Sequence, residues 1–179
     1  MKAKKRQSVI QLERNKEALG GGERSTTLSM NSKAWLHHSA WPAAVGSPPT
    51  KEIFGLVEVL GFAGPLVRVR VPGNDGEHLV TSKSISPANE EISSDMATML
   101  HMSEATVLDN ITQRYIAGNP YTLTGNILMS VNPCRFMSDV YSADTVTSHA
   151  GRFIGDLPPH LYAIAEDVSV HANEPHLTC

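Results

Sequence analysis

The residues that could bind a metal or act as nucleophiles are few and scattered. The chain has eight histidines and two cysteines in 179 residues. His37 and His38 are adjacent, but no carboxylate or cysteine lies at ligand spacing from them. Cys134 and Cys179 are too few for a four-cysteine zinc site or a disulfide framework. The sequence therefore predicts no metal site and two free thiols.

Acidic residues and glycine-rich stretches give no catalytic pattern either. The carboxylates at 144, 156, 166 and 167 are not spaced as a pair for acid–base work. The glycines at 20–22 follow no strand and precede no phosphate-binding lysine, so they read as a linker. The 179 residues contain no Gly-Lys dipeptide, which a phosphate loop requires. We therefore predict no catalytic residue.

One loop has residue types that could contact a small ligand. The apolar run 127–131 stops at Asn132-Pro133, and Arg135 and Tyr141 follow. Proline fixes the direction of the chain, and tyrosine offers an apolar ring with a hydroxyl group. On residue types alone, however, the pattern is more typical of a turn that ends a strand and carries a packed tyrosine.

Composition narrows the partners and the location. The net charge is −3 and the pI is about 6.2. Residues 1–33 carry a net charge of +5 and the remainder −8, so a strongly basic nucleic-acid binder is excluded for the whole chain. No apolar run approaches the roughly 20 residues needed to span a bilayer. We expect a cytoplasmic, reducing location, with no nucleic-acid partner and no membrane span.

The first half of the chain divides into an arm and a small β module. Residues 1–33, basic and then rich in glycine, serine and threonine, predict a disordered arm. Residues 34–90 predict a small antiparallel β-barrel, because short alternating strands are separated by Gly/Pro turns. About 50 residues bury only a small hydrophobic core, so we expect this module to pack against a neighbouring part of the protein for stability.

The second half, residues 91–168, predicts mixed α/β structure, and residues 169–179 a divergent tail. Ser103 is expected to cap a helix that buries a stripe of four residues: Val107, Leu108, Ile111 and Tyr115. A β-hairpin is expected at 121–131, with the strand 127–131 buried on both faces. Further helices are expected after Ser142, ending at His149, and from Pro158 to about Asp167.

Several segments of this second half, in order, resemble the beginning of a myosin heavy-chain motor domain. Residues 95–111 look like the stretch D-x-x-x-L-x-x-L-N-E-x-x-V-L-x-N-L. Residues 114–115 and 121–133 look like R-Y and I-Y-T-Y-T-G-x-I-L-V-A-V-N-P. Residues 140–141 and 157–167 look like I-Y and L-P-P-H-I-F-A-I-A-D-x-A. The small β module fits, by position and strand pattern, the β-barrel that precedes many myosin motor cores.

The resemblance implies a fold and an activity. The fold is an α+β or α/β fragment in which the barrel precedes the helix–β-hairpin–helix start of a P-loop motor core. The strand that ends in Asn-Pro leads, in the family, into the loop that holds the adenine of ATP. The matching positions are Asn132, Pro133, Arg135 and Tyr141. The family also implies actin as partner and a cytoskeletal myosin complex as location.

Departures from the family pattern limit what can be carried over. Cys134 and Phe136 stand where aromatic or basic residues are usual, and the segment 132–141 is one residue longer than common versions. No phosphate loop follows Asp167, so we expect a fragment truncated before that loop, without a Mg²⁺ site and without ATP hydrolysis. Whether the chain is an enzyme is left open. The alternatives are a stand-alone protein-interaction module and a nonfunctional truncated product.

Overall fold

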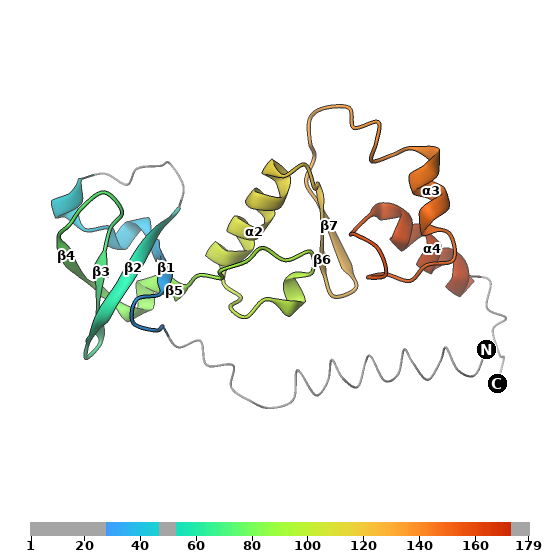
Figure 1. Ribbon diagram of the computed structural model, residues 1–179. Helices are drawn as coiled ribbons and strands as arrows, with labels where there is room; N and C mark the ends of the chain where they lie inside the picture. Colours follow the sequence, from blue (N-terminus) through green and yellow to red (C-terminus); the bar gives the residue numbers. More distant parts are fainter. Residues whose placement is uncertain (1–27, 47–52, 173–179) are drawn as a thin grey trace, which may run out of the picture.

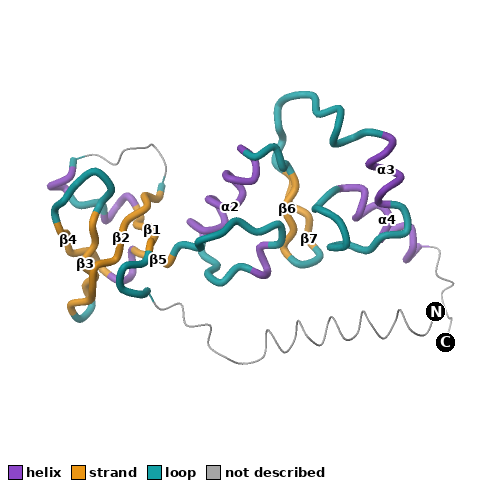
Figure 2. Tube along the Cα trace, viewed as in Figure 1, coloured by secondary structure: helices purple, strands orange, loops and turns teal. Residues whose placement is uncertain are grey.

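The computed structural model describes residues 28–46 and 53–172. Most of the predicted arm and most of the predicted tail lie outside these residues. Figure 1 shows the described elements in a row, with a small sheet at one end and α2 (Glu104–Ile116) and a β-hairpin in the middle. The helices α3 (Ala143–His149) and α4 (Leu161–Ala172) lie at the other end. Long loops join these three parts (Figure 2).

The small sheet contains five antiparallel strands in the order β4-β3-β2-β1-β5. Side chains alternate between its faces: Val67 and Val69 are buried, whereas Arg68 between them is exposed. The strands are β1 (Lys33–His37), β2 (Phe54–Ala63), β3 (Leu66–Arg70), β4 (Glu77–Thr81) and β5 (Ile85–Pro87). The sheet thus begins at the last residue assigned to the arm, and the domain boundaries stay predictions.

The antiparallel strands of the expected β-barrel are present, but they do not close into a barrel, because the sheet is open. β4 pairs with β3 and β5 pairs with β1, so these two strands are the opposite edges. They are joined only by the 3₁₀ turn Ser82–Ser84. A connection this short turns the chain around a corner, and the three residues of β5 are used in pairing with β1. The presence of short antiparallel strands could therefore be predicted from the sequence, but whether they close into a barrel could not.

The core of the sheet is a compact apolar cluster. Leu36, Val59 and Val69 have no exposed surface, and Val57 and Val67 are 1% exposed. Trp41 and Val45 pack against the cluster from the segment after β1. The sheet therefore has a hydrophobic core drawn from its own strands and the adjoining segment.

Helix α2 (Glu104–Ile116) starts as predicted but packs on a different face. Its capping box is complete: the Thr106 amide donates to Ser103 Oγ, and the Ser103 amide donates to Thr106 Oγ1. The predicted buried stripe is wrong, since Leu108 is 45% exposed. The buried side chains are instead Ala105, Thr106, Asn110 and Arg114. The buried row 106, 110 and 114 lies one position before the predicted row 107, 111 and 115.

The predicted hairpin is confirmed as β6 (Tyr121–Thr124) and β7 (Ile127–Ser130). β6 is buried, whereas β7 is an edge strand of a two-stranded sheet, with Ile127 67% exposed. The expectation that 127–131 is buried on both faces is therefore wrong for this chain. An apolar run can be recognised from sequence, but its burial depends on neighbouring strands.

Two helices follow the hairpin. α3 (Ala143–His149) begins at the predicted cap, where the Thr145 amide donates to Ser142 Oγ. α4 (Leu161–Ala172) begins after the two prolines rather than on them, and it continues past the predicted end near Asp167. The Gly151 amide donates to the Glu166 carboxylate and ties the end of α3 to α4.

Candidate functional site

The loop after β7 is shaped by its own backbone contacts. The Cys134 amide donates to Asn132 Oδ1 at 2.9 Å, which closes a tight turn around Pro133. Cys134 adopts a φ of 51° there, a left-handed conformation uncommon outside glycine. The Tyr115 hydroxyl on α2 donates to the Pro133 carbonyl at 3.3 Å. Asn132 therefore shapes the turn, and Tyr115 links it to α2.

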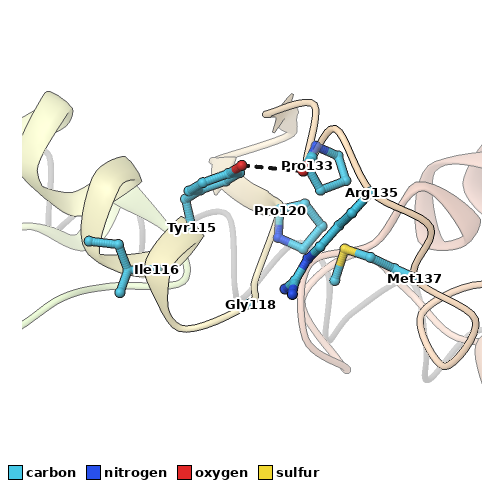
Figure 3. A pocket seen from close by; sticks show the side chains of 7 residues that line it. All are labelled: Tyr115, Ile116, Gly118, Pro120, Pro133, Arg135 and Met137. Carbon is cyan, nitrogen blue, oxygen red and sulfur yellow. Dashed lines mark hydrogen bonds between the residues drawn. The ribbon is translucent and has the colours of Figure 1, made fainter.

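An open hollow of about 300 Å³ lies between this loop and the end of α2. Figure 3 shows the rings of Tyr115, Pro120 and Pro133 beside the side chains of Arg135 and Met137. The Arg135 guanidinium lies next to Gly118, where an added Cβ would approach it to 3.9 Å. The hollow thus combines apolar rings with one positive charge, a combination that suits a planar, partly polar ligand.

The predicted site residues separate into two places. Pro133 and Arg135 line the hollow, and Asn132 sits in the turn above it. Tyr141 does not line the hollow. Its hydroxyl lies 2.9 Å from that of Tyr121, and its ring lies 5.9 Å from that of His160. Pro133 and Arg135 therefore lie together at the hollow, whereas Tyr141 belongs to a cluster of rings between β6, α3 and α4. The assignment of these residues to a binding site stays a prediction.

Comparison with known proteins relates the second half of the chain to one family. Residues 93–174 match the family model "Myosin head (motor domain)". Over 126 residues, 68% of the chain, it is 31% identical to unconventional myosin-VI of Bos taurus, of which it covers 10%. It is 43% identical over 72 residues, 40% of the chain, to myosin heavy chain 95F of Drosophila melanogaster, of which it covers 6%. Residues 93–174, which we call the myosin segment, therefore resemble the myosin head, and a partial myosin motor domain fits them.

The myosin match covers the hollow and the ring cluster but leaves the small sheet outside the family model. The match to myosin ID heavy chain of Dictyostelium discoideum, 38% identical over 74 residues, covers 41% of this chain and 7% of that protein. The chain thus spans about a tenth, or less, of the length of these curated relatives. The expected resemblance to a partial myosin motor domain is confirmed.

Buried polar side chains hold the myosin segment together beneath the hollow. Arg114 donates from Nε to Thr122 Oγ1 at 3.0 Å and from a terminal nitrogen to the Tyr121 carbonyl at 2.9 Å. Burial lowers the pKa of Arg114 from its usual value, yet a guanidinium stays protonated in proteins. This side chain fixes α2 against β6, and so positions Tyr115 over the loop.

A second set of polar contacts fixes the start of the myosin segment. Asn110 accepts from the Ser93 amide at 2.7 Å and donates to the Ser93 carbonyl at 3.0 Å. The Asp95 carboxylate accepts from the Gly125 amide in the hairpin turn at 2.8 Å. Sequence reasoning missed Asn110 and Arg114, although their spacing of four, continued back to Thr106, was a readable signal of one helix face.

Two further findings concern metals and membranes. Within residues 28–46 and 53–172, no group of three or more histidine, cysteine or acidic side chains is placed to hold a metal ion. None of the helices in the described part of the chain is long and apolar enough to cross a membrane. Cys134 is exposed in the loop with a free thiol.

Proposed function

We propose that residues 93–174 are the adenine-side part of a myosin motor domain, and that the hollow beside Tyr115 and Arg135 receives the base of ATP. The main support is that the residues matched to the myosin head include the Asn132-Pro133 loop, which lies beside the hollow. The longer protein is then an ATP-dependent, actin-based motor of the cytoskeleton, with actin contacts made outside these residues.

The residues of the hollow fit a nucleotide only in part. Tyr115, Pro120 and Pro133 offer apolar ring surface for a base, and Arg135 offers one cation at the rim. A volume of about 300 Å³ is at the lower end for small-molecule sites. The triphosphate needs a glycine-rich loop with its lysine, and the sequence has no Gly-Lys dipeptide. We therefore propose weak adenine contact by these 179 residues and no ATP hydrolysis.

A nucleotide titration followed by NMR tests the proposal. We expect a Kd of about 1 mM or weaker for Mg·ATP, equivalent to about −4 kcal/mol or less favourable. Adenosine should bind with a similar Kd, because no residue of the hollow is assigned to the phosphates. The shifts should map to the Tyr115–Pro133 region. Micromolar binding of Mg·ATP, or steady ATP turnover, would contradict the proposal.

Matched arginine variants locate the binding. Arg135→Ala should weaken the adenosine shifts, because it removes the charged wall of the hollow. Arg152→Ala, a similarly exposed arginine in the loop after α3, should leave them unchanged. Equal effects from the two variants would place the contact elsewhere on the chain.

A further inference from the structure

A cluster of five rings joins the hairpin to α3 and α4. His160, which immediately precedes α4, lies at its centre. Ring centroids lie 5.0 Å away for Tyr121 of β6, 5.0 Å for His149 at the end of α3 and 4.5 Å for Tyr162 of α4. The Tyr141 ring, from the loop before α3, is 5.9 Å away. One imidazole therefore contacts every element that meets at this junction.

The contacts of His160 assign its proton. The Tyr162 amide donates to Nδ1 at 3.1 Å, so Nδ1 carries a lone pair and serves as the cap of α4. Nε2 therefore carries the hydrogen and donates to the Val140 carbonyl at 3.0 Å. Both ring nitrogens are satisfied in the neutral form. A second proton on Nδ1 would face the N–H that it now accepts from, at the positive end of a helix.

His149 packs against His160 from the end of α3. Its Nδ1 lies 2.8 Å from the Thr145 carbonyl and donates to it, so Nε2 is the nitrogen without a hydrogen whenever the ring is neutral. That Nε2 is buried and has no hydrogen-bond partner among the described residues. Two protonated imidazoles 5.0 Å apart would repel each other. Burial, and then the charge on His149, lower the pKa of His160.

The Glu166 carboxylate of α4 accepts from the Gly151 amide at the end of α3, and the groups in ring contact with the two imidazoles are uncharged. They are the phenols of Tyr121 from β6, Tyr141 from the preceding loop and Tyr162 from α4. Burial and the contact with Tyr141 raise the pKa of Tyr121 above its usual value, so this phenol stays neutral. In residues 28–46 and 53–172, neither imidazole forms a salt bridge.

We propose that His149 and His160 form an acid-released clamp that holds α3 and α4 against the β6–β7 hairpin. Near neutral pH the unprotonated His160 caps α4, donates to the Val140 carbonyl and packs on Tyr121 and His149. Protonation of His160 removes the cap of α4 and places a charge inside the ring cluster, so α3 and α4 separate from β6. The clamp is independent of nucleotide binding in the hollow.

The direction of the pH dependence follows from the lowered pKa. An unfolded or released histidine has a pKa near 6.5 and takes up a proton first as the pH falls. The clamp is therefore complete above about pH 7.5 and weakens as the pH falls through 6.5. For one proton, the equilibrium constant for release rises by at most about tenfold per pH unit.

Hydrogen exchange of the whole chain, corrected for intrinsic rates, tests the clamp at pH 7.5 and 5.5. We expect faster exchange of residues 161–170 at pH 5.5, and no matching change in β2 or β3. His160→Asn should abolish the difference, since asparagine can cap a helix but does not titrate. The control is His78→Asn in β4. His78 is part-buried and lies outside the ring cluster, so this variant should show the same pH difference as the parent.

Either of two results would overturn the clamp: equal exchange of 161–170 at the two pH values in the parent, or a full pH difference in His160→Asn. If His160→Asn does not fold, NMR of the parent decides. The Tyr162 amide must then shift with the same midpoint as the His160 imidazole. A Tyr162 amide that ignores that titration would equally refute the clamp.

Discussion

The small sheet and the myosin segment are held together by different kinds of contact. The sheet buries Leu36, Val59 and Val69 completely, in a core made by neighbouring strands. The myosin segment instead buries Asn110 and Arg114, each paired to backbone or hydroxyl groups of another element. Met96 and Leu123 of this segment are buried, but several other large apolar side chains face outward, as at Leu108 (45% exposed), Ile116 (73%) and Ile127 (67%).

The two regions should therefore lose stability through different kinds of mutation. Apolar burial is non-directional and roughly proportional to area, so the sheet loses stability with each methyl group removed. Buried hydrogen bonds are directional, so loss of one partner leaves the other desolvated and unpaired. Both tryptophans, Trp35 and Trp41, belong to the sheet region. Tryptophan fluorescence therefore reports on the sheet, whereas circular dichroism at 222 nm reports mainly on the helices of the myosin segment.

The largest effect is expected from Leu36→Ala. The side chain has no exposed surface, and truncation of such a leucine costs about 2–5 kcal/mol of the free energy of unfolding. Leu79→Ala in β4 is the matched control, because Leu79 is 57% exposed and should change stability by less than about 0.5 kcal/mol. Urea unfolding followed by tryptophan fluorescence measures both. Similar midpoints for the two variants would mean that the sheet does not depend on its core.

An intermediate effect is expected from Arg114→Met. Methionine keeps a long apolar stem and helix propensity, but it leaves the Tyr121 carbonyl and Thr122 hydroxyl without their donor. The cost should be about 1–3 kcal/mol. It should appear in circular dichroism and in hydrogen exchange of β6, with the tryptophan transition unchanged. Gln113→Met, on the exposed face of the same helix, is the control, and a loss there equal to that of Arg114→Met would reject the polar anchor.

Local signals could be read from the sequence, whereas the choice of packed face could not. The caps at Ser103 and Ser142 and the hairpin turn depend on residues within a few positions of one another, and all were predicted. The burial of Asn110 and Arg114 depends on Ser93 and Tyr121, which other parts of the chain bring into place. Two adjacent rows of a helix lie only about 100° apart, so the apolar row looked the better candidate.

The candidate site divides in the same way. Pro133 and Arg135 reach the hollow because the turn that positions them is set by the adjacent Asn132. Tyr141 lies ten residues after the end of the predicted strand 127–131, beyond a long loop. Its position depends on its contacts with Tyr121 and His160. Contacts made by a loop with distant elements carry no local signature in a single sequence.

The smallest effect is expected from Leu108→Ala, and it tests which face of α2 is packed. A leucine that is 45% exposed gains only part of the 1.5–3 kcal/mol that full burial is worth, so about 1 kcal/mol or less should be lost. Alanine also has the higher helix propensity, which offsets part of that loss. Urea unfolding followed at 222 nm should therefore rank Leu108→Ala below Arg114→Met. If the order is reversed, α2 contacts its neighbours through the stripe of Val107, Leu108 and Ile111. The buried polar row would then not be what joins the helix to the hairpin.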